Sequence, residues 1–436
     1  MARICIDGFN LAMAEGSGIA TYARNLHGML GDLGHETQIL FSASRKVGDE
    51  NLLNQIALFD SPTRTRFSAA MASLARIVPP MRPVAREVRM TGEVITAEMA
   101  SHFPRADRVW ARRDVFHAAN RAHRAYGRMT PLRLGPDVAT DVMHWTCLLP
   151  LVEPRIANVY TLHDLIPLRL PYTTLDDKRS YFELCAQVAA RADRIFTVSE
   201  HSRRDIVQLL GVDEAKVVNT YQAVTLPPEV RDRSEQEVAD ELAGVFGLSP
   251  GGYFLFLGGV DPKKNPRRLV EAYAASLVKA PLVIVGAGWL GSRLASWASD
   301  ETFEASTSAG RGVETGRGRI RRYDFVPFAR LMSLIRGARA TLFPSLYEGF
   351  GLPVLESMLL GAPVITSTQG SLPEVAGDAA LLVDPYDTDA IRDAIRTLDA
   401  DADLRAELAA RGRAQATNFS PERYRERLRD AYAPLL

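Results

Sequence analysis

The stretch ATLFPSLYEGFGLPVLESMLLGAPVITS, residues Ala340–Ser367, contains a complete strand–helix–strand pattern. Ala340–Pro344 and Pro363–Thr366 are apolar runs typical of buried strands. A polar loop with glycines, Ser345–Gly351, follows the first run. A helix would begin near Pro353. The N–H groups of the first helical turn make no bond within the helix, so the missing N–H of proline costs nothing there. The pattern predicts two parallel strands joined by a helix.

The loop before this helix is expected to bind an anion, because backbone N–H groups at a helix N-terminus attract phosphate. Glu348 on the loop and Glu356 on the helix bracket it. Carboxylates repel phosphate but accept strong hydrogen bonds from hydroxyls. The pattern therefore suggests a ligand with hydroxyls on both sides of a diphosphate, such as a nucleotide sugar. The alternative is a structural unit with one capping and one exposed glutamate.

The string E-G-F-G-L-P-x-x-E, with Glu348 and Glu356 in its two Glu places, resembles the signature of the retaining glycosyltransferases of family four (glycosyl transferases group 1). The resemblance extends along nearly the whole chain, apart from roughly residues 45–135. It implies an α/β protein of GT-B fold. In that fold, two Rossmann-like domains with doubly wound parallel sheets face each other across a cleft.

Strand-like runs that alternate with helical patterns agree with such parallel sheets. They predict an N-terminal, acceptor-side domain over 1–226 and a C-terminal, nucleotide-sugar-binding domain over 227–418. A polar, charged segment begins the second domain. In the resembled family the last helix crosses back to the first domain. Residues 419–436, with a helix at Pro421–Tyr432, are expected to do this.

Composition is that of an ordinary globular protein: 436 residues, 47% hydrophobic, 24% charged and a formal net charge of zero. With no net charge, the protein as a whole does not attract nucleic acid electrostatically. Cys5, Cys147 and Cys185 are widely spaced, which predicts buried apolar residues in a reducing cytoplasm. The N-terminus lacks the pattern of a signal peptide, and no apolar run is long enough to span a bilayer.

Residues 61–135 are predicted to form an Arg-rich helical insertion in the first domain. They hold fourteen Arg against five acidic residues, interleaved with apolar side chains. This pattern fits either a solvated insertion or an interfacial surface that anionic lipids attract. No nucleic-acid-binding signature accompanies the charge. The expected location is cytoplasmic, with peripheral association at the inner face of the membrane left open.

Two motifs of the first domain lie at strand ends. Gly16 and Gly18 open the first helix, where glycines let backbone approach a diphosphate or sugar closely; the alternative is a flexible turn. The resemblance favours binding, because family members carry a similar G-x-G-I-x-x-Y run, with Tyr22 in the last place. In the family, the residue that matches His163 lies in the cleft near the donor sugar. Asp164 would orient the loop or stabilise an oxocarbenium ion.

The second domain contains a lysine pair after its first strand. Lys264 occupies the Lys place of the family's Arg…Lys pair, whereas Gly259 stands in the Arg place. Lys263 or Arg267 would compensate by helping to hold the diphosphate, although lysine is a point charge without the fork of arginine. Val326 follows another strand and matches a position whose backbone reads the nucleobase; it is equally consistent with a simple strand end.

The resemblance assigns roles at the opening motif. Glu356 would accept the ribose hydroxyls and Glu348 the hydroxyls of the donor sugar. Backbone N–H groups of Phe350, Gly351 and Leu352 would hold sugar and phosphate. His163, Lys264 and Glu348 are the expected catalytic residues.

The reaction implied is retaining transfer of a hexose, with mannose as the specific expectation, from a GDP-sugar or UDP-sugar. The acceptor would be a glycan or lipid-linked glycan in polysaccharide or cell-envelope biosynthesis. No cofactor or metal is expected, since no Asp-x-Asp motif stands at a strand end. Front-face attack is the mechanism that the family implies.

Four alternatives remain. A GT-B epimerase or phosphorylase would use a similar fold, and a silent nucleotide-sugar-binding subunit would bind without turnover. The fourth is a dehydrogenase, because Gly286, Gly288 and Gly291 match part of a dinucleotide-binding fingerprint. Asp300 is poorly placed to bind ribose in that reading, because the intervening segment lacks an evident second strand.

Overall fold

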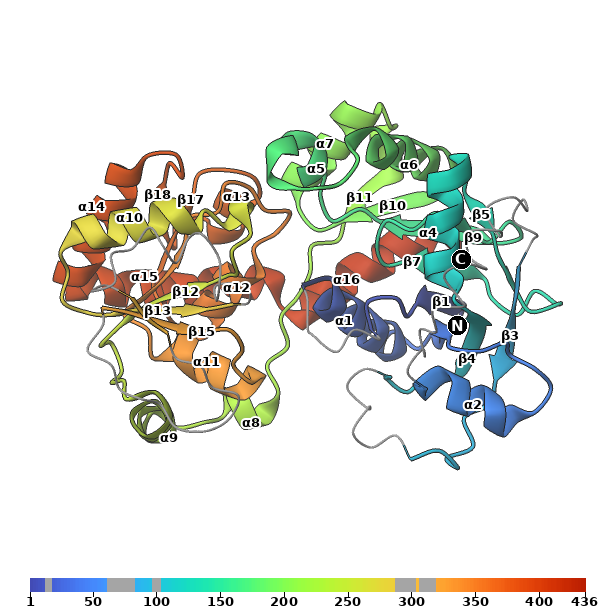
Figure 1. The fold of residues 1–436 in the computed structure, drawn as a ribbon, viewed down its shortest axis with the longest axis horizontal. Coiled ribbons are helices and arrows are strands. Elements are labelled where there is room, and N and C mark those ends of the chain that lie inside the picture. The colour runs from blue at the N-terminus through green and yellow to red at the C-terminus, as the bar shows by residue number, and fades with distance from the viewer. Residues whose placement is uncertain (12–17, 61–82, 96–102, 287–302, 306–318) are drawn as a thin grey trace.

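The computed structural model describes residues 1–11, 18–60, 83–95, 103–286, 303–305 and 319–436. They form two α/β lobes joined near residues 220–227 and again near residue 419 (Figure 1). Both lobes have a parallel sheet as their central layer, with helices on its two faces. The predicted α/β class with two parallel-sheet domains is therefore confirmed.

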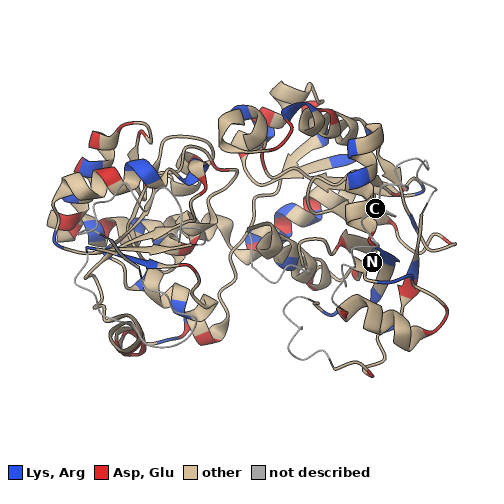
Figure 2. Cartoon of the chain, viewed as in Figure 1, with Lys and Arg blue, Asp and Glu red and all other residues tan. Residues whose placement is uncertain are grey.

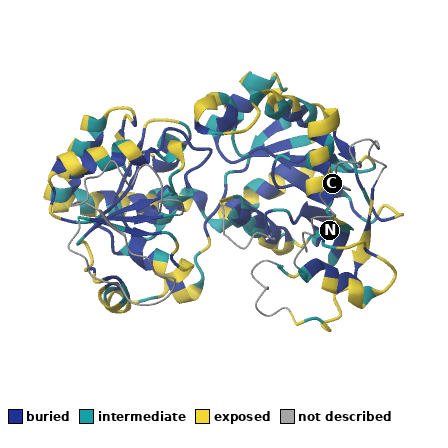
Figure 3. Ribbon diagram, viewed as in Figure 1, coloured by how far each residue is buried: buried dark blue, intermediate teal, exposed yellow. Residues whose placement is uncertain are grey.

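The elements of the N-terminal lobe are β1 (Arg3–Asp7), α1 (Gly18–Asp32), β2 (Glu36–Ala43), α2 (Asn51–Phe59), β3 (Val84–Val88), β4 (Arg108–Arg113), α4 (Val115–Tyr126), β5 (Thr130–Pro131), β6 (Arg133–Leu134), β7 (Val142–Trp145), β8 (Leu151–Val152), β9 (Ala157–Thr161), α5 (Ile166–Arg169), η3 (Pro171–Thr173), α6 (Lys178–Arg191), β10 (Arg194–Thr197), α7 (Glu200–Leu210), η4 (Glu214–Lys216) and β11 (Val217–Asn219). Its main sheet has the order β11-β10-β9-β7-β1-β2-β4-β3-β6. Among the described strands of this sheet, only the β3–β4 pair is antiparallel. The central strand β1 is buried apart from Arg3, as a sheet covered on both faces requires (Figure 3).

The described part of residues 61–135 is a mixture of strands and one long helix, so the predicted helical insertion is only partly correct. β3 and β4 extend the main sheet beyond β2, and α4 is the one long helix of this stretch in its described part. In β4 the residues Val109, Trp110 and Ala111 are buried although arginines flank them. Pairing with a strand about 70 residues earlier places this segment, and local composition carries no signal of that partner. The most Arg-rich part, 61–82, lies outside the described residues.

The elements of the C-terminal lobe are α8 (Pro228–Arg231), α9 (Glu235–Glu241), η5 (Leu242–Phe246), β12 (Phe254–Leu257), η6 (Pro262–Lys264), α10 (Pro266–Ser276), β13 (Leu282–Val285), β14 (Phe303–Ala305), β15 (Ile320–Tyr323), α11 (Phe328–Arg336), β16 (Ala340–Phe343), α12 (Leu352–Leu359), β17 (Val364–Ser367), α13 (Leu372–Ala376), β18 (Leu381–Val383), α14 (Thr388–Ala400) and α15 (Ala402–Ala416). The sheet order is β14-β15-β13-β12-β16-β17-β18, and all pairs are parallel. The β16–α12–β17 unit is the one that the opening stretch predicted.

The last helix, α16 (Pro421–Tyr432), follows η8 (Thr417–Phe419), precedes η9 (Ala433–Leu435) and lies against the N-terminal lobe beside α1 (Figure 1). Arg425 donates to Asp32 at 3.2 Å. Tyr432 hydrogen-bonds to the buried His144 of β7. α16 therefore packs on the N-terminal lobe through contacts with α1 and β7.

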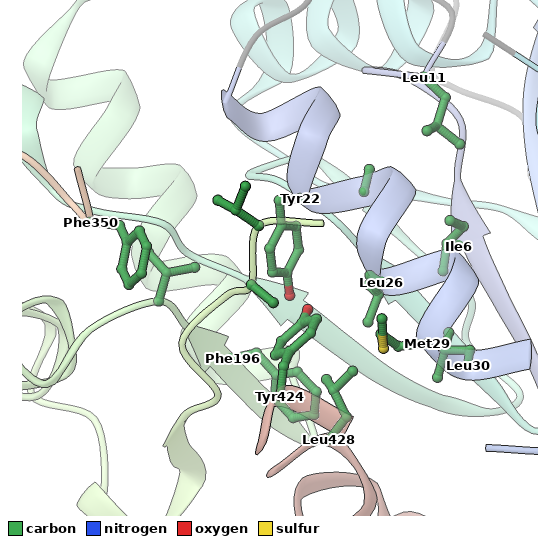
Figure 4. Close-up of a cluster of buried hydrophobic side chains, with 14 of the residues drawn as sticks. Ile6, Leu11, Tyr22, Leu26, Met29, Leu30, Phe196, Phe350, Tyr424 and Leu428 are labelled. Atoms are coloured by element: carbon green, nitrogen blue, oxygen red, sulfur yellow. The ribbon is translucent and has the colours of Figure 1, made fainter. Parts of the chain in front are cut away.

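One hydrophobic cluster connects the two lobes. It contains Tyr22 of α1 and Tyr424 of α16, whose hydroxyls point toward each other, and Phe350 of the loop before α12 (Figure 4). Phe350 packs edge-on against Phe419, with ring centroids 5.5 Å apart. The start of α12 is therefore anchored in a core shared by both lobes.

Charged residues of both signs are spread over the two lobes. Lysines and arginines are interspersed with acidic residues along the described chain (Figure 2). Among the described residues, no helix is both long enough and apolar enough to cross a bilayer.

Candidate functional site

Three loops from three strand ends meet between the lobes. His163 and Asp164 follow β9, the lysine pair follows β12, and Glu348 follows β16. A Cβ on Gly349 would lie 2.7 Å from His163 O and 2.9 Å from Asp164 Cβ, so only glycine fits at this contact. The carboxyl ends of the two sheets therefore face each other, which is where open α/β sheets bind ligands.

Both lysines converge on Glu348. Lys264 Nζ donates to Glu348 Oε1 at 2.6 Å, and Lys263 Nζ lies 3.9 Å from Oε2. The Lys264 ammonium also lies 4.5 Å from the centre of the Phe343 ring, a cation–π distance. Leu346 N donates to Lys263 O at 2.7 Å, which ties the two loops together. The structure thus brings three predicted site residues into one buried cluster.

The charges of this cluster depend on one another. Burial raises the pKa of Glu348, but Lys264 and Lys263 outweigh burial and hold the pKa below its ordinary value. Burial lowers the pKa of Lys263, whereas Glu348, Asp164 and Asp261 raise it, and the net direction is upward. Burial raises the pKa of Asp164 despite the opposing charge of Lys263. Glu348 is therefore ionised and Lys263 protonated at neutral pH.

The start of α12 presents backbone donors toward this cluster. The N–H groups of Phe350, Gly351 and Leu352 donate to no acceptor in the described part of the chain. Gly351 has φ +100°, and a Cβ there would lie 2.6 Å from Leu372 Cδ2. Ser371 stabilises the loop, because its hydroxyl Oγ lies 2.9 Å from each of two loop carbonyl oxygens, Glu348 O and Phe350 O, and donates to them. The amides are held in place before any ligand arrives.

Glu356 lies one turn into α12 and is partly exposed. Within the described residues its carboxyl has no hydrogen-bond or ion-pair partner. Burial raises its pKa to about 7. A partly buried carboxyl without a partner is costly, and hydroxyl groups of a ligand would supply the missing donors.

His163 is held as the neutral imidazole. Its Nε2 lies 2.9 Å from Thr146 O, and because a carbonyl only accepts, Nε2 carries the proton. Tyr22 packs edge-on against the ring, with centroids 4.8 Å apart. Burial lowers the pKa of His163 to about 4. Nδ1 is then an acceptor at neutral pH.

The glycines of the first domain are only partly placed. Gly18 begins α1, and a Cβ there would lie 3.4 Å from Leu352 Cδ1, so the α1 N-terminus adjoins the α12 N-terminus. Gly16 lies outside the described residues. Tyr22, the last residue of the predicted run, is fully buried and hydrogen-bonds to Thr161 at 2.8 Å.

The remaining predicted residues of the second domain lie at the same sheet edge. Gly259 packs against Gly286, whose Cβ would fall 2.5 Å from Gly259 N. The Val326 side chain is buried in the core, whereas Phe325 beside it is exposed. Arg267 points elsewhere and pairs with Glu271 at 2.8 Å, so Lys263 is the cation beside Lys264. The run that begins at Gly286 continues beyond the described residues.

Sequence reasoning missed a set of polar contacts that joins the lobes. Glu374 of α13 accepts from Glu200 N at 2.8 Å, His201 N at 3.2 Å and Tyr221 Oη at 2.6 Å. It caps α7 from the opposite lobe. Tyr347, next to Glu348, donates to Asp205 of α7. The partners lie more than 140 residues apart, so no local pattern could reveal them.

The described residues contain no group of three His, Cys, Asp or Glu side chains placed to hold a metal ion.

Comparisons with known proteins agree with this geometry. Residues 16–226 match the family model described as Glycosyltransferase Family 4, and residues 248–415 match Glycosyl transferases group 1. The chain is 36% identical over 281 residues to the O-antigen chain mannosyltransferase B of Escherichia coli, which covers 63% of this chain and 69% of that relative. The chain belongs to the group 1 glycosyltransferases.

This glycosyltransferase is also similar to a second curated relative in sequence and to a solved structure in fold. It is 28% identical over 320 residues to the serotype-specific mannosyltransferase WbdA of Escherichia coli, over 70% of this chain but only 37% of that relative. The crystal structure of Anabaena HepE in complex with UDP-glucose aligns over 100% of both chains, with a TM-score of 0.63 and 13% identity. That likeness concerns the fold, and the predicted GT-B fold is confirmed.

Proposed function

We propose that this glycosyltransferase transfers a mannosyl residue from GDP-mannose, with retention of configuration, to a glycan or lipid-linked glycan in polysaccharide biosynthesis. The similarity to O-antigen mannosyltransferases supports the sugar and the acceptor class. The single structural observation behind the proposal is the Lys264–Glu348 pair, 2.6 Å apart, at the amide-lined start of α12.

In this proposal the donor lies across the start of α12. The N–H groups of Phe350, Gly351 and Leu352 hold the sugar and the diphosphate, and Lys264 offsets the charge that develops on the leaving phosphate. Glu356 accepts hydrogen bonds from the ribose hydroxyls, and Glu348 accepts hydrogen bonds from the hydroxyls of the donor sugar.

The transfer step conserves the anomeric face. The bond between the sugar carbon and the phosphate oxygen breaks, and the acceptor oxygen bonds to the same face of that carbon. The acceptor's proton passes to the departing phosphate. Neutral His163, whose Nδ1 accepts, is placed to orient a hydroxyl near this carbon. We propose that no metal takes part in the step.

Thermal denaturation with nucleotide sugars tests donor choice, since a ligand of the native state raises apparent stability. GDP-mannose is expected to raise Tm more than UDP-glucose or ADP-glucose, with or without EDTA. Transfer from radiolabelled GDP-mannose, followed by NMR of the product's anomeric centre, tests retention. A larger Tm shift with UDP-glucose would contradict the proposed donor, and an inverted product would contradict the proposed stereochemistry.

The cytoplasmic location stays a prediction. Contact with an anionic membrane also stays a prediction, because the Arg-rich residues 61–82 lie outside the described part. Binding to vesicles that contain anionic lipid, compared with neutral vesicles, tests the second of these.

A further inference from the structure

A cavity of about 630 Å³ lies between the lobes, next to the Lys263–Glu348 cluster. The N-terminal lobe lines it with residues between Asp164 and Leu175, and the C-terminal lobe lines it with Asp261, Pro262 and Lys263. Its size is in the range of small-ligand sites, about 300–1,000 Å³.

The cavity is separate from the proposed donor site at the start of α12. Of the described residues that are predicted to bind the donor, only Lys263 lines it; Glu356, Val326 and the amides of the α12 start do not. Most of its lining comes from the N-terminal lobe, the predicted acceptor-side domain, so the cavity lies where an acceptor is expected to bind.

The two ends of the cavity differ in chemistry. Asp164 and Lys263 form a charged inner end. The outer end has Tyr172, with 68% of its surface exposed, and Leu175, which is fully exposed. Tyr172 Oη lies 3.3 Å from Tyr386 Oη of the opposite lobe, and Tyr386 is 46% exposed. The Arg268 guanidinium, 5.4 Å from the Tyr386 ring centre, supports that ring.

Exposed large apolar side chains gathered at one rim mark a binding surface. Tyrosine is well suited to it, because the ring supplies an apolar face and the hydroxyl a polar edge. A sugar ring has the matching character, with C–H faces that stack on an aromatic ring and hydroxyls at its rim. The cavity also holds more than one pyranose ring.

We propose that Tyr172 and Tyr386 form an aromatic rim that binds the second sugar of a saccharide acceptor. The first sugar then reaches the charged inner end beside Asp164 and Lys263. This inference rests on the proposed function. It makes the protein selective for acceptors of two or more sugars, because a monosaccharide cannot contact the inner end and the rim together.

Calorimetric titration of the full chain in the presence of GDP tests the rim without requiring turnover. The probes are methyl α-mannoside, α-mannobiose and α-mannotriose. The wild-type protein is expected to bind mannobiose at least about tenfold more tightly than methyl α-mannoside. Tyr172→Ala and Tyr386→Ala should each weaken mannobiose binding by about tenfold, the factor that 1.4 kcal/mol represents, and leave the affinity for GDP unchanged.

Two controls separate stacking from damage. Tyr172→Phe keeps the ring and should retain most of the affinity for mannobiose. Tyr126→Ala removes a tyrosine of α4, a helix that contributes no residue to the cavity, and it should leave the affinity for mannobiose unchanged.

Equal affinity of mannobiose for the wild type and both alanine variants would overturn the rim, and so would no binding of any saccharide to the wild type. Failure of the proposed function is distinguishable, because it appears as the absence of a Tm shift with GDP-mannose, whatever the saccharides do.

Discussion

At Glu348 a buried carboxylate is kept charged by two lysines that the loop after β12 delivers. Lys264 makes the short contact, and Lys263 stands further off. Removing one partner of a buried pair leaves the other charge poorly solvated, which costs more than the pair contributes. The two lysines therefore have unequal roles although they are neighbours in the chain.

Lys264→Ala is expected to lower kcat for mannosyl transfer by about 10²–10³-fold, the typical effect of removing one group that stabilises transition-state charge. It should also cost about 1–3 kcal/mol of stability, because Lys263 remains near Glu348. Steady-state kinetics and urea denaturation measure the two effects. Arg267→Ala is the matched control, since Arg267 is exposed and pairs with Glu271. Equal losses in both variants would contradict a specific role for Lys264.

Glu356 predicts a pH dependence of stability. Its pKa is about 7 in the folded chain against an ordinary 4.5. The folded state therefore holds the proton more tightly, and this residue contributes destabilisation that grows as pH rises from 4.5 to 7. Glu356→Gln should be more stable than the wild type by about 1–3 kcal/mol at pH 8 and equal to it below pH 4.5. A pH series of Tm values checks this; a constant difference would contradict it.

The same variant separates stability from binding. Glu356→Gln should weaken GDP binding while it stabilises the fold, because the amide is a poorer acceptor for ribose hydroxyls than a carboxylate. Tighter GDP binding by the variant would contradict the ribose assignment.

At the scale of elements, the strand–loop–helix units place the site, and most of them could be predicted. Apolar runs predicted β16 and β17, and Pro353 predicted where α12 begins, because burial and local backbone chemistry determine such patterns. The sequence did not predict β4, since the arginines at both of its ends hide the apolar pattern of its buried central residues. Contacts between lobes, such as that of Glu374 with α7, leave no periodic trace. The approach of Lys264 to Glu348 was expected from the family resemblance and not from spacing.

Gly351→Ala is expected to distort the loop before α12. Its φ of +100° and the 2.6 Å approach to Leu372 Cδ2 make any side chain strained. The variant should lose about 1–3 kcal/mol of stability and bind GDP more weakly.

Gly28→Ala is the matched control for that glycine. It lies within α1, with nothing within 4 Å of an added Cβ. It should gain about 0.5–1 kcal/mol, because alanine favours the helix. Chemical denaturation of both variants checks the opposite signs.

At the scale of the whole molecule, the lobes are held by a shared core and by polar contacts across the cleft. Glu374 accepts three hydrogen bonds from the N-terminal lobe, two of them at the start of α7, where a negative charge also complements the helix dipole. This single carboxylate therefore couples the stability of one lobe to the other.

Glu374→Ala should cost about 1–3 kcal/mol and split the thermal transition into two, because three partly buried donors lose their acceptor. Differential scanning calorimetry measures this, and small-angle scattering should show a larger radius of gyration. Glu407→Ala, which removes an exposed pair with Arg411, should stay within about 0.5 kcal/mol of wild type. A single unchanged transition in Glu374→Ala would show that the shared core and the remaining contacts, such as that of Tyr347 with Asp205, are enough to join the lobes.

The position of α16 has a consequence for biosynthesis. The N-terminal lobe is translated first, yet Tyr424 and Tyr432 complete its packing around Tyr22 and His144. On the ribosome this lobe must wait, with an apolar groove uncovered, until the second lobe has emerged. Nascent chains stalled before residue 421 should therefore recruit chaperones more strongly than those stalled after the whole helix has been released.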